Sequence, residues 1–242
     1  MVIKDKYIRM DWSDFFTSSV GKKFVMALTG LFLISFLIIH VGLNACIWAG
    51  DNGEMFNKSA HFMATMVVIR IMEWVLFLGF FIHIIQGYVL EGKNLSRRGT
   101  GYRINPANKT SKWYSRTMGL LGTLLLLFLI MHISHFWTPS RLGGLWNIHQ
   151  LAEVEYGGKA YHNLYGEMIH VFKNPFIVVL YVIGCISLAY HLMHGFQSAF
   201  RTLGVYNLRY VAILNGLGKG FSIIVPFTFA MMPVSIYLGW VK

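Results

Sequence analysis

The chain has 242 residues, of which 55% are hydrophobic and 16% aromatic, while only 13% are charged. Soluble domains carry about 25% charged residues, so this composition excludes an ordinary soluble globular protein. The formal net charge of +11 suits either nucleic acid or anionic lipid, and the positions of the basic residues decide between the two.

Five apolar segments follow one another along the chain, at about residues 21–48, 62–90, 114–138, 174–200 and 210–239. Each is long enough for a tilted helix across a hydrocarbon core of about 30 Å. The polar N-terminal stretch shows no cleavable signal pattern. We therefore predict an all-α integral membrane protein, a single membrane domain (1–242) that forms a five-helix bundle behind an N-terminal arm (1–20). Cys46 and Cys185 lie in apolar segments and are interpreted as small buried side chains.

Lysine and arginine are concentrated at one side of the expected membrane. The N-terminal arm and the second and fourth loops are basic, whereas the first loop has only Lys58 and the third mixes basic residues with glutamates. The positive-inside rule places the N-terminus in the cytoplasm and the C-terminus outside. This charge then serves topology and membrane lipid contact, or in addition a docking surface for a cytoplasmic partner. Nucleic acid is not expected.

Six histidines lie inside the apolar segments: His40, His83, His132, His135, His191 and His194. Ionisable residues within a membrane are functional candidates. At 1.5 Å per residue, His40 and His132 lie about 28 and 27 Å from the inner ends of their helices, and His83 and His191 about 11 and 14 Å. Two levels of paired histidines suit two stacked b-type haems, bound non-covalently because the chain has no C-x-x-C-H motif. Depth favours His132 over His135 as the partner of His40.

Two segments share a local pattern. Residues 83–88 read HIIQGY and residues 191–196 read HLMHGF. Gly87 and Gly195 each follow a histidine by four residues and share its helix face, where a missing side chain admits a flat macrocycle or, alternatively, a neighbouring helix. The match aligns His191 with His83, so His191 rather than His194 is the predicted ligand.

The order and spacing of these segments resemble a known family. The stretches that carry the likeness are FLIIHVGLNAC, NKSAHFMATM, FFIHIIQGYVL, LIMHISHFW and LYVIGCISLAYHLMHGFQSAFRTLGV. Over nearly its whole length, the chain resembles the single-chain, five-helix, di-haem cytochrome b membrane subunit of succinate dehydrogenase and fumarate reductase.

The resemblance implies a distal haem on His40 and His132 and a proximal haem on His83 and His191. It implies a subunit of the bacterial cytoplasmic (inner) membrane that anchors a flavoprotein and an iron–sulfur protein on the cytoplasmic side. Electrons would pass between succinate or fumarate and a membrane quinone, usually menaquinone, so the chain would be the quinone-reactive subunit of an oxidoreductase. Some fumarate reductases of this family have a transmembrane glutamate in the region of helices 4 and 5. The fourth and fifth segments here have no acidic residue, which leaves that proton path and the direction of catalysis open.

Other polar residues are candidates for the quinone and haem sites. Glu73, three residues after Arg70, is either a structural ion pair or a proton group for quinone, a role for which His61 and His135 are alternatives. Candidates for contact with the haem propionates are Ser18, Ser19, Lys22, Lys23 and Arg201, each of which alternatively serves topology alone.

Two other functions remain open from the sequence. The cytochrome b subunit of a hydrogenase or formate dehydrogenase also contains paired histidines. A proton-coupled transporter with a histidine relay would bind no haem, and we would expect more spans and inverted repeats in its sequence.

Overall fold

The computed structural model describes residues 11–98, 112–205 and 207–242. Within them, five helices are long and apolar enough to cross a membrane, over Ser19–Trp48, Val67–Ser96, Met118–Leu142, Pro175–Thr202 and Tyr210–Tyr237. The expectation of an all-α membrane fold with five spans is confirmed. A short antiparallel hairpin is the sheet that accompanies the helices in the described ranges.

The spans are built from helices with short extensions. The first is α2 (Ser19–Asn44), preceded by α1 (Trp12–Thr17) and continued by the 3-10 turn η1 (Ala45–Trp48), and the second is α4 (Val67–Arg98). The third combines α6 (Met118–His132), the π-helix η3 (Ile133–Trp137) and α7 (Thr138–Leu142), after the short α5 (Trp113–Arg116). The last two are α9 (Pro175–Thr202) and α10 (Leu208–Tyr237).

Local sequence explains several helix ends. The Ser18 hydroxyl accepts a hydrogen bond from the Gly21 amide (2.9 Å) and so caps α2. Pro175 occupies the first turn of α9, where its missing N–H leaves no hydrogen bond unmade. Met66 has an extended backbone (φ −69°, ψ 120°), which ends α3 (Glu54–Thr65). Residues 62–65 therefore belong to α3, and the second span begins at Val67 instead of near residue 62, where the sequence placed it.

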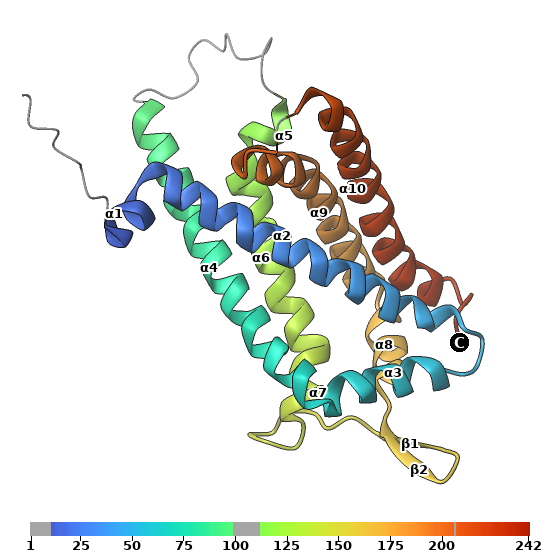
Figure 1. The fold of residues 1–242 in the computed structure, drawn as a ribbon. Coiled ribbons are helices and arrows are strands. Elements are labelled where there is room, and N and C mark those ends of the chain that lie inside the picture. The colour runs from blue at the N-terminus through green and yellow to red at the C-terminus, as the bar shows by residue number, and fades with distance from the viewer. Residues whose placement is uncertain (1–10, 99–111, 206) are drawn as a thin grey trace, which may run out of the picture.

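Four helices form a ring and the fifth lies outside it. In Figure 1, α2, α4, α6 and α9 surround a common centre, and neighbouring helices in this order pack against each other. α10 packs chiefly along α9 and also touches α2. The ring places one face of each of the four helices toward the middle of the bundle, where the histidines lie.

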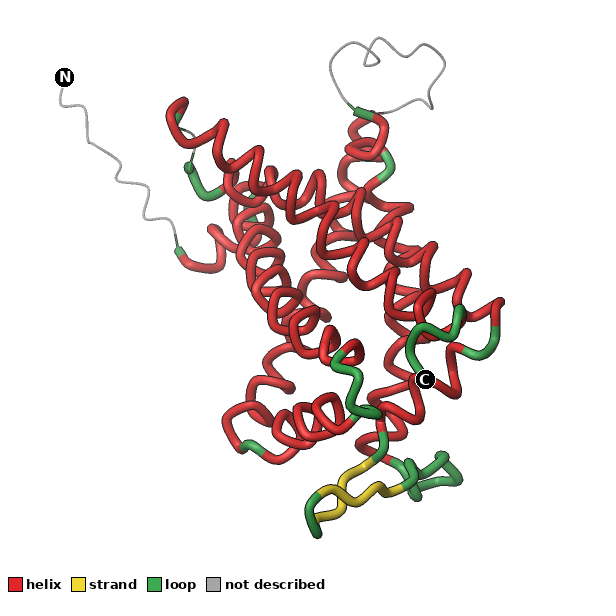
Figure 2. Tube along the Cα trace, turned by 90° about the vertical axis from the view of Figure 1, so that its right-hand side faces the viewer, coloured by secondary structure: helices red, strands yellow, loops and turns green. Residues whose placement is uncertain are grey.

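The two ends of the bundle differ. One end, called the α1 end here, contains α1, the C-terminal part of α4, and α5 (Figure 1). At the other, called the hairpin end, are α3, α7, α8 (Leu164–Phe172) and the hairpin of β1 (Glu153–Tyr156) with β2 (Lys159–His162). Figure 2 shows the hairpin, in yellow, extending beyond the helices. The main cluster of buried apolar side chains lies toward this end and includes Ile47, Phe56, Met168 and Phe172.

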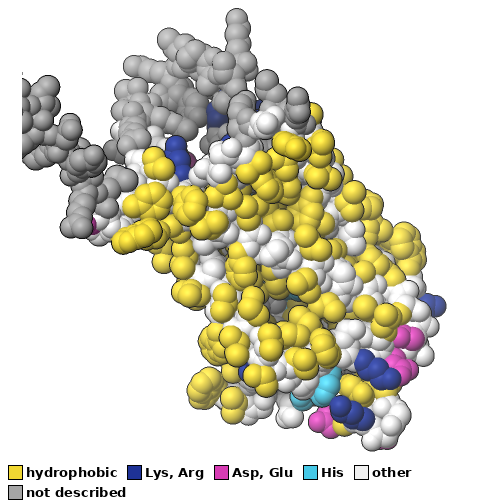
Figure 3. Space-filling model, in the orientation of Figure 1, with side chains coloured by type: hydrophobic (Ala, Val, Ile, Leu, Met, Phe, Trp, Pro, Cys, Tyr) yellow, Lys and Arg dark blue, Asp and Glu magenta, His cyan; other side chains and the backbone are white. Residues whose placement is uncertain are grey.

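The sides of the bundle are apolar. Many large hydrophobic side chains of the spanning helices are exposed, among them Ile38, Ile71, Phe81 and Ile224. Figure 3 shows hydrophobic side chains covering the middle of one face, with charged and histidine side chains gathered toward the hairpin end. Contiguous exposed apolar surface of this extent identifies the lipid-facing surface of a membrane protein.

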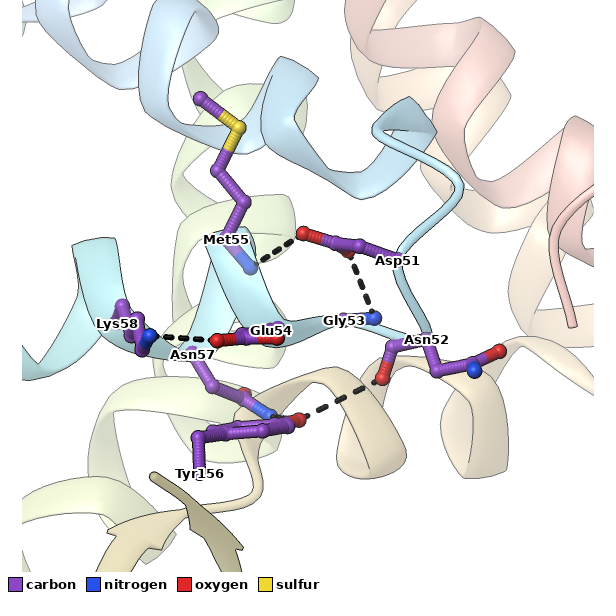
Figure 4. A network of polar contacts seen from close by, with 8 residues as sticks. All are labelled: Asp51, Asn52, Gly53, Glu54, Met55, Asn57, Lys58 and Tyr156. Atoms are coloured by element: carbon purple, nitrogen blue, oxygen red, sulfur yellow. Dashed lines mark hydrogen bonds and ion pairs between the residues drawn. The ribbon is translucent and has the colours of Figure 1, made fainter. Parts of the chain in front are cut away.

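A polar network holds the hairpin end together. Asn57 on α3 is completely buried, and its amide nitrogen donates to the hydroxyl of Tyr156 (3.1 Å) and to the side-chain oxygen of Asn163 (3.2 Å). Its side-chain oxygen accepts from the Tyr165 amide (2.9 Å). Figure 4 shows Asn57 and Tyr156 beside the turn in which the Asp51 carboxylate accepts from the backbone at the start of α3. Because its partners come from the hairpin and from α8, Asn57 joins three elements of this end.

Candidate functional site: two pairs of histidines

The ring of four helices brings four histidines together as two pairs. The His40 ring on α2 lies 5.7 Å, centre to centre, from the His132 ring at the end of α6. The His83 ring on α4 lies 6.2 Å from the His191 ring on α9. These are the two pairings that helix depth predicted. The assignment of the four histidines as haem ligands stays a prediction.

The His40–His132 pair, toward the hairpin end, is surrounded by aromatic rings. Phe36 stacks on His40 with ring centres 5.0 Å apart, and Phe128 stacks on His132 at 5.7 Å. Each phenylalanine precedes its histidine by four residues on the same helix, which places it on the same face. Phe136, Tyr181 and Phe229 complete the wall.

The His83–His191 pair, toward the α1 end, has small residues beside it. A Cβ atom on Gly30 would lie 3.6 Å from Cε1 of His83, and one on Gly122 would lie 3.9 Å from Cε1 of His191. Sequence reasoning missed both glycines. A signal was present in the sequence, because Gly30 precedes His40 by ten residues and Gly122 precedes His132 by ten residues.

The two glycines that the sequence did single out have different surroundings. A Cβ atom on Gly87 would touch the end of the Met26 side chain at 3.4 Å, whereas one on Gly195 would meet nothing within 4 Å. Gly87 therefore borders α2 and Gly195 borders open space. Their role in packing a haem stays a prediction.

In each pair, Nδ1 of one histidine has a polar partner on α2, and Nδ1 of the other has none among the described residues. On α2, Thr29 Oγ1 lies 3.1 Å from Nδ1 of His83, and Asn44 Nδ2 lies 3.3 Å from Nδ1 of His40. Since the Thr29 hydroxyl already donates to the Val25 carbonyl (2.9 Å), the imidazole N–H of His83 is the donor to Thr29. At His83, an imidazole that donates through Nδ1 presents its unprotonated Nε2 to a metal. At His40, the Asn44 amide can only donate, so Nδ1 accepts that hydrogen bond.

The partner rings have unsatisfied nitrogens. Among the buried side-chain polar atoms of the described residues, three have no hydrogen-bond partner: Nδ1 of His132, Nδ1 of His191 and Oε1 of Gln86. A buried unpaired polar atom costs about 1–3 kcal/mol and calls for an explanation. Two of the three belong to the predicted ligands.

The donor set fits a haem better than a simple metal ion. In the part of the chain that the structure describes, no three His, Cys, Asp or Glu side chains gather as a metal-ion site. A haem iron needs only two protein donors, one on each side of the porphyrin. With metal–nitrogen bonds of about 2 Å, two imidazoles on opposite sides of one metal have their centres about 6 Å apart. Both pairs are close to this spacing.

Glu73 lies in a cluster of donors near the hairpin end. Its Oε2 accepts from Arg70 (2.9 Å) and its Oε1 from Nε of Arg141 on α7 (3.1 Å), while the indole N–H of Trp137 also donates to Oε1. The ion pair with Arg70 agrees with the spacing in the sequence. Arg141 lies 68 residues from Glu73, and no local pattern indicated that contact. The cluster joins α4 to the end of the third span.

The two histidine candidates for quinone chemistry lie in different places. His61 on α3 packs edge-on against Tyr161 of the hairpin, with ring centres 5.0 Å apart. His135 lies in the π-helix, where its Nδ1 is hydrogen-bonded to the Tyr181 hydroxyl at 3.0 Å. The Tyr181 ring also contacts His132, so His135 is linked to the His40–His132 pair and His61 to the hairpin.

The five candidates for contact with the haem propionates differ in whether they line a cavity. A cavity of about 390 Å³ between the start of α2 and the end of α9 is lined by Val20, Lys23, His194, Gln197, Ser198, Arg201 and Thr202. Lys23 and Arg201 line it, whereas Lys22 and Ser19 do not. The Ser18 hydroxyl caps α2 and donates to the Phe15 carbonyl (2.6 Å).

Five membrane helices with histidine pairs at two levels fit a cytochrome b membrane anchor. The chain is 22% identical, over 178 residues, to the succinate dehydrogenase cytochrome b558 subunit of Bacillus subtilis (strain 168), and the match covers 73% of each chain. No family model and no solved structure matches the chain. The resemblance seen in the sequence is confirmed, and the chain is an integral protein of the bacterial inner membrane.

Proposed function

We propose that the chain is the membrane anchor and electron-transfer subunit of a succinate:quinone oxidoreductase. One observation carries the proposal: a chain similar to a succinate dehydrogenase cytochrome b subunit has two histidine pairs, each at the spacing that two axial haem ligands require. The chain acts on quinone and not on the dicarboxylate, since its sequence contains no nucleotide-binding fingerprint.

The four histidines hold two b haems, one on His40 and His132 and one on His83 and His191. A haem with two histidine ligands takes up and releases single electrons while its iron stays closed to substrate. The helices supply orientation, because the hydrogen bond from His83 to Thr29 and the stacking of Phe36 on His40 fix the rings. Gly30 and Gly122 place no side chain beside the rings of the α1-end pair.

The α1 end faces the cytoplasm in this proposal. Basic residues that support the orientation include Lys22, Lys23, Lys112 and Arg201. Others, namely Lys4, Lys6, Arg9, Arg103 and Lys109, lie outside the described residues. An iron–sulfur subunit and a flavoprotein subunit dock at this end, and menaquinone reacts near the pair at the hairpin end. Lys23 and Arg201 line the cavity between α2 and α9, and they would hold the propionates of the haem on His83 and His191.

A difference spectrum tests the haem assignment. Membranes that contain the chain should show, after dithionite reduction, the α-band of a b-type cytochrome at two haems per chain. A colourless protein would overturn the proposal and favour the histidine-relay transporter.

Two neighbouring histidines provide a matched pair of variants. His191→Ala should lower the haem content from two to one per chain, because it removes an axial ligand. His194→Ala should retain both haems, because His194 borders the α2–α9 cavity instead of facing His83. Measured haem-to-protein ratios in the reverse order would refute the choice of ligand.

Partner subunits separate this function from the cytochrome b subunit of a hydrogenase or formate dehydrogenase. The chain, purified in mild detergent from its own host, should bring down a flavoprotein and an iron–sulfur protein with succinate dehydrogenase activity. Recovery of a nickel or molybdenum enzyme in their place would refute the proposed complex.

A further inference from the structure

Lys219 is a charged residue inside the fifth membrane span, and the proposed electron transfer does not use it. It follows Tyr210, the first residue of that span, by nine residues, which places its backbone about 14 Å along the helix. The residue is exposed, and it lies on α10, the helix outside the ring of four. A lysine that faces lipid at this depth is costly and calls for a partner.

The neighbouring helices do not provide that partner. Among the spanning helices, α10 packs chiefly against α9 and also against α2, and the sequences of all three contain no aspartate or glutamate. Across residues 11–98, 112–205 and 207–242, Lys219 forms no ion pair and no side-chain hydrogen bond. The described part of the chain therefore offers no counter-charge to this lysine.

The geometry of α10 directs the Lys219 ammonium toward the α1 end of the bundle. Long side chains on a helix tilt toward its N-terminus, and α10 begins at the α1 end (Figure 1). A lysine in a membrane helix extends its charge toward the headgroups in this way. The positions four and three residues before it are Asn215 and Gly216. A Cβ atom on Gly216 would meet nothing within 4 Å, so no neighbouring element obstructs that direction.

A groove between α9 and α10 lies at the same end of the bundle. Its lining includes the apolar Phe200, Val211 and Leu214 and the polar Arg201 and Asn215. Arg201 also lines the α2–α9 cavity, and its five N–H donors allow it to serve an anion on either side of α9. Apolar walls beside cationic and amide donors match a molecule that has both an acyl chain and an anionic headgroup.

We propose that an anionic phospholipid binds to α10, with its phosphate held by the Lys219 ammonium and the Asn215 amide and an acyl chain in the α9–α10 groove. The lipid belongs to the leaflet at the α1 end. Its negative charge compensates the lysine that the chain itself leaves unpaired. The site does not depend on haem, so it can be tested separately from the proposed function.

Native mass spectrometry tests the site, because one spectrum counts both bound lipids and copies of the chain. The full chain, purified and delipidated in detergent, should retain one phosphatidylglycerol at concentrations at which phosphatidylcholine is not retained. Lys219→Met should weaken phosphatidylglycerol binding about fivefold, the factor expected for one basic residue at an anionic membrane surface. Lys219→Arg should restore it, because the charge is retained. Equal affinity in the methionine variant and the unmodified chain would overturn the proposal.

Lys22→Met is the matched control, with the same change of side chain at the same end of the bundle. Lys22 lines neither the groove nor the α2–α9 cavity, and its variant should bind lipid as the unmodified chain does. Displacement of phosphatidylglycerol by inorganic phosphate would reveal a site for free anions. A change in the number of chain copies in Lys219→Met, with lipid binding unaltered, would reveal a contact with another protein helix. Either result would overturn the lipid assignment.

Haem content separates this inference from the proposed function. Lys219→Met should retain two haems per chain, because Lys219 lies on α10 and the predicted ligands lie on the ring helices. Selective lipid binding by a chain without haem would leave the lipid site intact and overturn the proposed function. Two haems in a chain that does not distinguish phosphatidylglycerol from phosphatidylcholine would do the reverse.

Discussion

The two histidine pairs have the same donors and opposite surroundings. At the hairpin end, the residue four positions before each histidine is a phenylalanine, Phe36 for His40 and Phe128 for His132, and both rings stack on the imidazoles. At the α1 end, the same position holds Gly79 before His83 and Ser187 before His191. One pair is enclosed by aromatic rings and the other has small residues beside it.

This difference shows that paired histidines alone do not determine how a cofactor is held. The aromatic wall fixes the imidazoles at the hairpin end by packing, and Phe229 extends that wall from α10. At the α1 end, the hydrogen bond from His83 to Thr29 fixes one imidazole, and glycines 30 and 122 lie beside the two rings. We therefore expect the two haems to respond to different substitutions.

The largest expected effect comes from adding a side chain beside His83 at the α1 end. Gly30→Ile places a branched side chain against His83, where even a Cβ atom would lie 3.6 Å from the ring. The haem content should fall from two to one per chain, with the loss confined to the His83–His191 pair. Gly42→Ile is the control on the same helix, because a Cβ atom at Gly42 meets nothing within 4 Å. Two haems in the Gly30 variant, by pyridine haemochrome assay, would contradict the role of this glycine.

A smaller effect is expected when the aromatic wall is opened. Phe36→Ala removes the ring stacked on His40, and such ring contacts contribute about 0.5–1.5 kcal/mol beyond buried area. The haem on His40 and His132 should then dissociate faster, on the order of tenfold or less. Transfer of haem to apomyoglobin measures this rate. Phe62→Ala, at an exposed position of α3, is the control and should have no effect. Faster loss of the haem on His83 and His191 in the Phe36 variant would contradict this prediction.

The smallest effect concerns a single hydrogen bond. Thr29→Val removes the acceptor of the His83 N–H, a bond that makes the imidazole a more basic ligand and so favours oxidised iron. The midpoint potential of the α1-end haem should rise by tens of millivolts, since such a bond contributes about 0.5–1.5 kcal/mol and a one-electron couple changes about 59 mV per factor of ten. Redox titration of Thr29→Val and of the control Thr228→Val, whose hydroxyl bonds only to its own helix, would show whether the effect is specific.

The sequence predicted the parts of the molecule that the membrane constrains. Helix length follows from bilayer thickness, so the five spans could be located, and a constant rise per residue then placed His40 level with His132 and His83 level with His191. The turn at Met66, the helices α3 and α8 and the hairpin were not predicted, because these elements are short and stabilised by contacts made elsewhere in the fold.

Helix rotation and distant contacts limited the prediction of the site. Gly30 and Gly122 face histidines on other helices, a fact that depends on the angle of each helix about its axis. Arg141 reaches Glu73 across 68 residues, and Tyr181 reaches His135 across 46. Likewise, the cavity between α2 and α9 distinguishes Lys23 and Arg201, which line it, from Lys22, which does not.

The buried Asn57 has a consequence for how the chain is made. Its three hydrogen-bond partners lie 99, 106 and 108 residues further along the chain. During synthesis, α3 therefore emerges with an amide that must stay hydrated until the third span has crossed the membrane and the hairpin has followed it. The hairpin end is consequently assembled late, after the helices that contain His40, His83 and His132 have already been inserted.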